Sequence, residues 1–337
     1  TAGIEFNQDK LEDNMWGYHR TVDQKVNIGS AFFQNEWKNE HWGFLIGGRL
    51  DKHNLIDHVI FSPRANLRYN PTENINLRFS YSSGFRAPQA FDEDLHVENV
   101  GGNVAMVELA DNLKEERSQS LSASADIYHR FGAFQVNFLV EGFYTKLSDV
   151  FALTDGEVVD GILTRTRYNA PGARVMGLTL EGKMAYLTKF QLQAGVTLQQ
   201  SHYSEPHVWN PDAPAVKKMM RTPNTYGYFT ATYTPIKPLS IALSGTYTGS
   251  MLVPHEPVPG FLENPITVNT KDFFDIGLKA AYDFKLYKSM NLQVNAGIQN
   301  IFNAYQNDFD KGADRDSGYI YGPSLPRSFF AGVKISY

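Results

Sequence analysis

Apolar and polar residues alternate with a period of two in many short segments of the chain. In residues 290–299, Leu292 and Val294 lie on one face of an extended strand, whereas Gln293 and Asn295 lie on the other. The same alternation occurs in further segments at residues 75–81, 121–129, 134–144, 190–198, 239–247, 274–283 and 329–337. Helical periodicity is nearly missing, so the sequence predicts an all-β chain of about fourteen strands, each with one apolar and one polar face.

The connections between the predicted strands alternate between two lengths. The short ones are turn-like and lie near residues 38–41, 71–74, 130–132, 187–189, 235–238 and 286–289. The long ones lie near residues 8–24, 86–116, 152–163, 203–221, 250–271 and 303–324, with one shorter member near 52–58. This alternation is typical of an antiparallel up-and-down transmembrane β-barrel, in which the long loops are extracellular and the short turns periplasmic.

A soluble β-sandwich is the main alternative, because its strands also have one apolar and one polar face. Sandwich sheets do not sort their connections by length, however, and they rarely follow a simple up-and-down order. Many predicted strands also carry aromatic residues near their ends, where the rings of a barrel meet the two lipid–water interfaces. Examples are Phe134, Tyr144, Tyr233, Phe329 and Tyr337. The sequence therefore favours the barrel.

Composition excludes several kinds of site and function. The 337 residues include no cysteine, which excludes disulfides and thiolate metal sites, and the net charge of −5 does not suggest nucleic acid as a partner. No run of about twenty apolar residues occurs, so no membrane-spanning helix is predicted. The motifs G-x-S-x-G and H-E-x-x-H and the P-loop are missing. We therefore expect neither an enzyme nor a bound cofactor, although some outer-membrane barrels are enzymes.

Several short segments occur in an order that resembles one protein family. They are residues 61–64 (FSPR), 84–88 (GFRAP), 112–114 (NLK) with Glu116 and Ser118, 169–177 with Glu181, 300–303 (NIFN) and 323–327 (PSLPR). With these segments the chain resembles the C-terminal part of the β-barrel of TonB-dependent outer-membrane receptors, which transport iron chelates, haem and cobalamin. The run 322–337, which ends in Tyr337, resembles the Bacteroidota branch of that family.

The resemblance implies an architecture, a location and a function. It implies a barrel of about 22 strands around a plug, placed among the lipids of the outer membrane of a Gram-negative cell. Residues 1–337 would be the C-terminal portion of that barrel, with the plug domain, the TonB box and the N-terminal strands lying outside this sequence. Energy would come from the TonB–ExbB–ExbD complex through the plug. An iron-siderophore is the first expected ligand, with haem and cobalamin as alternatives; a passive porin-like channel is the alternative of a different class.

The loop that follows Phe85 supplies the first candidate ligand-binding residues. In haem-transporting members of the family, a Phe-Arg-Ala-Pro motif precedes a loop histidine that helps to capture haem iron, and here residues 85–88 precede His96. Arg86 is suited to an anionic group of a ligand. Both residues have simpler interpretations, because His96 can be an exposed loop histidine and Arg86 can pair with neighbouring carboxylates.

The later long loops supply further candidates. His202, His207 and Trp209 lie in one of them and His255 in the next. Aromatic loops with basic tips suit the outer vestibule of a receptor for a large planar or chelate ligand. No pair of these histidines has the spacing and third partner of a transition-metal site.

An acidic run in the last long loop suggests calcium. It contains Asp308, Asp310, Asp314 and Asp316, and carboxylates at such spacing can wrap a calcium ion. An EF-hand loop needs glycine at its sixth position, where this run has Ala313. A solvated loop is the simpler interpretation.

Overall fold

One antiparallel sheet dominates the computed structural model, which describes residues 1–95, 104–287, 289–323 and 325–337. It contains fifteen strands, of which β13 lies off the main path, and the other strands neighbour each other in chain order. They are β1 (Ala2–Met15), β2 (Arg20–Lys38), β3 (Trp42–His53), β4 (Ile60–Thr72), β5 (Ile75–Arg86), β7 (Glu116–Phe131), β8 (Phe134–Ser148), β11 (Ala173–Tyr186), β12 (Phe190–His207), β14 (Thr225–Ile236), β15 (Leu239–Thr248), β18 (Phe273–Tyr287), β19 (Met290–Gln299) and β20 (Ser328–Ser336). The predicted all-β, antiparallel, up-and-down architecture of about fourteen strands is confirmed.

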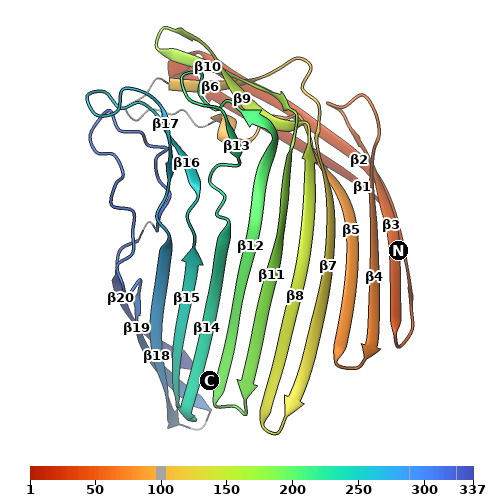
Figure 1. Ribbon diagram of the computed structural model, residues 1–337, viewed down its shortest axis with the longest axis vertical. Helices are drawn as coiled ribbons and strands as arrows, with labels where there is room; N and C mark the ends of the chain where they lie inside the picture. The colour runs from red at the N-terminus through yellow and green to blue at the C-terminus, as the bar shows by residue number, and fades with distance from the viewer. Residues whose placement is uncertain (96–103, 288, 324) are drawn as a thin grey trace.

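The sheet curves along its width, and its connections are sorted by length between its two ends (Figure 1). The turns after β2, β4, β7, β11, β14 and β18 are short. The connections after β3, β5, β8, β12, β15 and β19 are longer and gather at the other end (Figure 1). We call the two ends the short-turn end and the long-loop end. This sorting agrees with the sequence.

One predicted long loop, residues 8–24, is wrong, and another, residues 152–163, does lie in the long connection between β8 and β11 but forms strands there. Residues 8–24 belong to β1 and β2, which stay paired as far as Met15 and Arg20 and are joined by the 3-10 turn η1 (Trp16–Tyr18). Residues 152–163 belong to a hairpin of β9 (Val150–Val159) and β10 (Ile162–Ala170). These strand segments carry polar residues on both faces, so the apolar alternation that marks the other strands does not mark them.

Smaller sheets order the long-loop end. β6 (Val104–Leu109) pairs in parallel with β10, which pairs in the antiparallel sense with β9. β16 (Leu252–His255) pairs with β17 (Ile266–Asn269), and β13 (Val216–Lys218) extends β12. The three clusters of buried apolar side chains also lie here, centred on Ile60, Ala173 and Val253. The long connections are thus packed structure rather than open loops.

The sheet exposes large apolar side chains along its strands. Phe33, Phe44, Phe79 and Leu121 are each more than two-fifths exposed, which suits a surface that contacts lipid. In the described part of the chain, no helix has the length and hydropathy needed to cross a bilayer.

Aromatic rings gather near the short turns, as the sequence predicts. The rings of Trp42 and Tyr69 stack with centroids 4.2 Å apart, and those of Phe134 and Tyr186 lie 4.6 Å apart. Such rings are typical of the level where lipid meets water.

Candidate functional site

A pocket of about 440 Å³ lies at the long-loop end, a volume within the range of small-molecule sites. Six of its lining side chains carry the argument that follows: Arg86, Phe151, Arg165, Arg167, His207 and Trp209. They come from β5, β9, β10, the end of β12 and the segment after β12. We call this site the arginine pocket. Three of the predicted ligand-binding residues meet in it: Arg86, His207 and Trp209.

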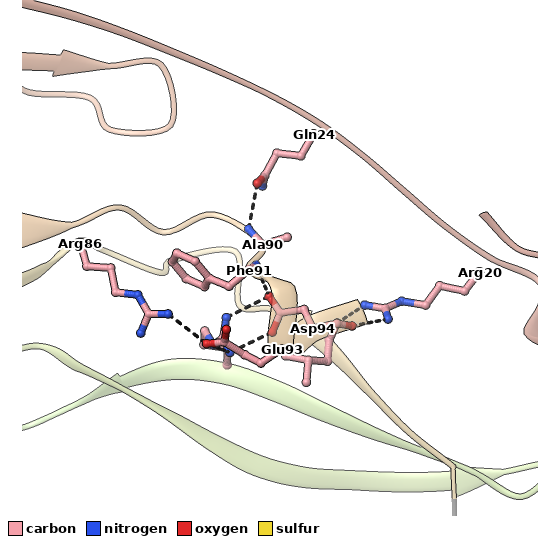
Figure 2. Close-up of polar contacts among 9 residues, drawn as sticks. Arg20, Gln24, Arg86, Ala90, Phe91, Glu93 and Asp94 are labelled. Atoms are coloured by element: carbon pink, nitrogen blue, oxygen red, sulfur yellow. Dashed lines mark hydrogen bonds and ion pairs between the residues drawn. The ribbon is translucent and has the colours of Figure 1, made fainter. Parts of the chain in front are cut away.

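Arg86 is the last residue of β5 and is fixed by rings and a carboxylate. Its guanidinium group lies 3.8 Å from the ring centroid of Phe91 and 5.7 Å from that of Phe151. Its Nη2 donates a hydrogen bond to Glu93 Oε1 at 2.9 Å (Figure 2). Stacking on aromatic rings and a carboxylate contact together hold the guanidinium plane in one orientation.

Arg167 on β10 is held by a buried carboxylate of η2 (Asp92–Leu95). Its Nη1 donates to Asp94 Oδ2 at 2.9 Å, and its Nη2 lies 2.8 Å from Asp94 Oδ1. Asp94 is 2% exposed and Arg167 5% exposed. Water is therefore largely excluded from this ion pair, and removing Arg167 would leave the buried carboxylate of Asp94 without its cationic partner.

Glu93 lies between the two arginine side chains. Its Oε1 is 2.9 Å from Arg86 Nη2 and 3.6 Å from Arg167 Nη2. Burial opposes ionisation of this carboxyl group, but hydrogen bonds from its own backbone and from Arg86, with the charges of both arginines, outweigh burial. They hold the pKa of Glu93 below its usual value, so Glu93 is an anion at neutral pH.

The turn that carries both carboxylates is anchored to the start of β2. Figure 2 shows Arg20 and Arg86 approaching η2 from opposite sides. Arg20 Nη1 donates to Asp94 O at 2.7 Å, and Arg20 Nη2 donates to Val107 O on β6 at 2.6 Å. Gln24 Oε1 accepts a hydrogen bond from Ala90 N at 2.8 Å. The polar segment at the start of β2 thus positions the connection after β5, which carries Glu93 and Asp94.

His207 and Trp209 also line the arginine pocket. The imidazole of His207 packs on the ring of Tyr203, with centroids 4.7 Å apart. Trp209 Nε1 is buried, and no other described residue accepts a hydrogen bond from it. The pocket therefore combines guanidinium groups from β5 and β10, the carboxylates of Glu93 and Glu256, and aromatic side chains from β9, the end of β12 and the segment after it.

The other predicted histidines lie elsewhere. His202 pairs in register with Arg174 on β11 and does not line the arginine pocket. His255 is 5% exposed, stacks on Tyr319 and places its Nε2 2.9 Å from Asp310 Oδ2. Its imidazole is thus engaged within the protein. His96 lies outside the described residues.

Three of the predicted calcium ligands are engaged in hydrogen bonds within the protein, and the backbone N–H of Asp316 donates to Asp310 Oδ2 at 3.1 Å. Asp308 accepts hydrogen bonds from Tyr321 Oη at 2.5 and 2.7 Å, whereas Asp310 accepts from His255. Asp316 accepts from the backbone N–H of Glu256 at 2.9 Å. Asp314 is exposed. In the described ranges, no three His, Cys, Asp or Glu side chains form a group that could hold a metal ion. Calcium binding by this run stays a prediction that these contacts do not support.

Sequence reasoning missed the two arginines of β10. Arg165 and Arg167 alternate with threonines in the segment TRTRY, residues 164–168. Two arginines at a spacing of two would lie on one face of a strand. Recognising residues 162–170 as a strand would therefore have paired Arg165 with Arg167. Nothing in the sequence places them beside Arg86.

A family model described as "TonB dependent receptor-like, beta-barrel" matches residues 2–301. No curated protein shows significant sequence similarity to the chain.

Several solved structures share the fold. A variant of the ferric enterobactin receptor PfeA from Pseudomonas aeruginosa, in complex with enterobactin, is 18% identical with a TM-score of 0.70, covering 98% of this chain and 51% of that one. The siderophore receptor PirA from Acinetobacter baumannii is 15% identical with a TM-score of 0.69 and the same coverage. The iron transporter FrpB from Neisseria meningitidis is 18% identical with a TM-score of 0.63, covering 93% of this chain and 46% of that one. The chain spans about half the length of these structures.

Proposed function

The chain belongs to the TonB-dependent receptor family, and from that premise we propose that it is part of an outer-membrane receptor that takes up an iron-siderophore. The long-loop end faces the outside of the cell and captures the chelate. The family is one of receptors and transporters rather than of enzymes.

The arginine pocket is the observation that carries this proposal. Three guanidinium groups, from Arg86, Arg165 and Arg167, surround a space that is also lined by the rings of Phe151 and Trp209. Guanidinium groups bind anionic oxygens through a planar fork of donors, and aromatic walls contact flat rings. A ligand that is both anionic and aromatic fits this combination, and ferric catecholate chelates have both properties.

Haem is the second candidate, and His207 is the residue that favours it. A neutral imidazole can serve as an axial ligand of haem iron, and His207 lines the arginine pocket. His255 is less suited to this role because its imidazole is already paired with Asp310. Cobalamin is a third candidate on family grounds alone.

Active transport rather than passive diffusion also forms part of the proposal. By family, the complete protein has a plug and a TonB box and receives energy from TonB, ExbB and ExbD. A passive porin-like channel is the rival. Uptake that stops when TonB is deleted would support the receptor, whereas uptake that continues would favour the channel.

Direct binding to the complete receptor tests the ligand class. Isothermal titration in detergent would compare ferric enterobactin, the cationic hydroxamate chelate ferrioxamine B, haemin and cobalamin. We expect the tightest binding for ferric enterobactin. Binding of cobalamin alone, or of none of the four ligands, would contradict the siderophore proposal. Tighter binding of haemin than of ferric enterobactin would identify haem as the ligand instead.

A further inference from the structure

Two adjacent carboxylates of η2 meet the arginine pocket in different ways. Asp94 is 2% exposed and makes two close contacts with Arg167. The Glu93 side chain is 54% exposed and contacts both Arg86 and Arg167 through the single atom Oε1. Asp94 is therefore part of the buried framework, whereas Glu93 is a solvent-accessible anion in the lining of the arginine pocket.

We infer that Glu93 is a displaceable internal anion, which holds the place between Arg86 and Arg167 that an anionic oxygen of the ligand takes on binding. The inference rests on the proposed function and deepens it. Ligand binding then exchanges the carboxylate of the protein for an oxygen of the ligand.

Both arginines keep other contacts when Glu93 leaves. Arg86 stays stacked on Phe91, at 3.8 Å from the ring centroid, and Arg167 stays bound to Asp94. The guanidinium groups are therefore preorganised for an incoming anion, and the ligand does not have to order them. The exchange is also easy, because an ion pair with a carboxylate as exposed as Glu93 contributes little to stability.

In this arrangement Glu93 makes the affinity of the pocket depend on the charge of the ligand, and we call this effect the charge filter. A neutral or cationic chelate offers no oxygen anion that can replace the glutamate. A ligand with one weak anionic group gains little binding free energy, because its contact with the arginines only replaces the similar contact of the Glu93 carboxylate. A chelate with several anionic oxygens gains more, because it can contact Arg86 and Arg167 together. Specificity thus comes from a repulsive group as well as from the attractive ones.

The test compares two variants of the complete receptor that lose one negative charge on the same turn. Glu93→Gln removes the internal anion while keeping the size of the side chain, and Asp92→Asn is the matched control. Titration uses ferric enterobactin as the anionic probe and ferrioxamine B as the cationic one. We expect Glu93→Gln to bind ferric enterobactin about 3- to 10-fold more tightly than the wild type. Asp92→Asn should stay within about twofold, and Glu93→Asp, which keeps the charge, should stay near the wild type. Binding of ferrioxamine B should not tighten in Glu93→Gln.

The failures are distinguishable. Equal or weaker binding of ferric enterobactin by Glu93→Gln, relative to Asp92→Asn, overturns the charge filter while the siderophore proposal stands. Equal tightening of both probes overturns it as well, because it would show an effect unrelated to ligand charge. If the wild type binds no anionic chelate, or if Arg86→Ala binds it as well as the wild type does, the proposed site itself fails and the filter fails with it.

Discussion

His255 Nε2 lies 2.9 Å from Asp310 Oδ2, and this contact joins two long connections that are 55 residues apart in the chain. The imidazole also stacks on the ring of Tyr319 with centroids 3.8 Å apart and an interplanar angle of 4°. Both side chains of the ion pair are buried, at 7% and 5% exposure. The acidic run 308–316 therefore ties the β16–β17 hairpin to the last connection.

The His255–Asp310 contact predicts energetic coupling between the two connections. His255→Ala and Asp310→Ala should each increase local opening of the β16–β17 hairpin. The double variant should lower the free energy of opening by less than the sum of the two single effects. We expect a coupling free energy of about 0.5–3 kcal/mol, measured by hydrogen exchange at residues 252–255 and 266–269. Asp314→Ala, an exposed acid of the same run, is the control. Additive effects of the two substitutions would show that the contact carries no free energy.

Replacing Arg86 should weaken ligand capture. Arg86→Ala removes a stacked guanidinium group from the arginine pocket, and we expect the affinity for ferric enterobactin to fall about 10- to 100-fold. Arg130→Ala, near the short-turn end, should leave the affinity unchanged. Titration calorimetry on both variants measures the difference. A loss of equal size in both variants would mean that net charge, rather than the pocket, determines affinity.

Removing Asp94 should loosen the long-loop end without unfolding the main sheet. Asp94→Ala leaves the buried Arg167 guanidinium with only the longer contact to Glu93 Oε1, at 3.6 Å, and costs up to about 3–5 kcal/mol. Hydrogen-exchange protection should fall at residues 104–109 and 162–170 and persist in β7 and β8. Asp92→Ala serves as the control for the same turn. Unchanged protection in Asp94→Ala would mean that water reaches Arg167.

A pH effect is expected where Glu115 meets His58 and Arg117. Burial opposes ionisation of Glu115, but hydrogen bonds from Arg117, its own backbone and His58 outweigh burial and lower its pKa. A folded-state pKa below the unfolded value stabilises the contact above the unfolded pKa, near 4.5, and this stability is lost as the pH falls through the folded pKa. The connection after β3 should therefore separate from the segment before β7 only in acid below that value.

Spin labels can measure this separation, because the sequence has no cysteine of its own. Labels at Asp57→Cys and Asp111→Cys would report the distance between the two connections as the pH is lowered from 7 to about 3. In a Glu115→Gln background the distance should no longer change with pH. A distance that changes in the same way in that background would assign the effect to another group.

The two faces of a strand should respond differently to charge. Leu121 on β7 is 42% exposed among the apolar side chains of the outer surface, whereas Ser122 points to the opposite face. Leu121→Arg should lower the free energy of unfolding in lipid vesicles by up to about 2–4 kcal/mol, depending on its depth. Ser122→Arg should be tolerated. Similar losses in both variants would contradict the assignment of the lipid-facing side.

The strands with one apolar and one polar face are the part of the fold that could be predicted from the sequence. An apolar environment on one side and a polar one on the other produce the alternation seen at Leu292 and Gln293. The ends of β1 and β2 carry no such signal because both of their faces are largely polar, and the β9–β10 hairpin carries none because both of its faces mix apolar and polar residues. The alternation therefore disappears where the strands continue.

The sequence could predict individual residues of the candidate site but not their assembly into one pocket. Arg86, His207 and Trp209 stand out because of their residue types and their places at strand ends. Their meeting with Arg165 and Arg167 depends on tertiary contacts between connections, which local patterns do not encode. The burial of His255 could not be predicted for the same reason, because it depends on a tertiary contact with Asp310 in another connection.

The parallel pairing of β6 with β10 constrains the order in which the chain can fold. All of β7, β8 and β9 lie between these two strands in the chain. This pairing therefore cannot form until the β7, β8 and β9 segments have been placed, and such distant pairings form slowly. During folding the strands of the main sheet can therefore pair before β10 brings Arg165 and Arg167 to the arginine pocket, so we expect the pocket to form late.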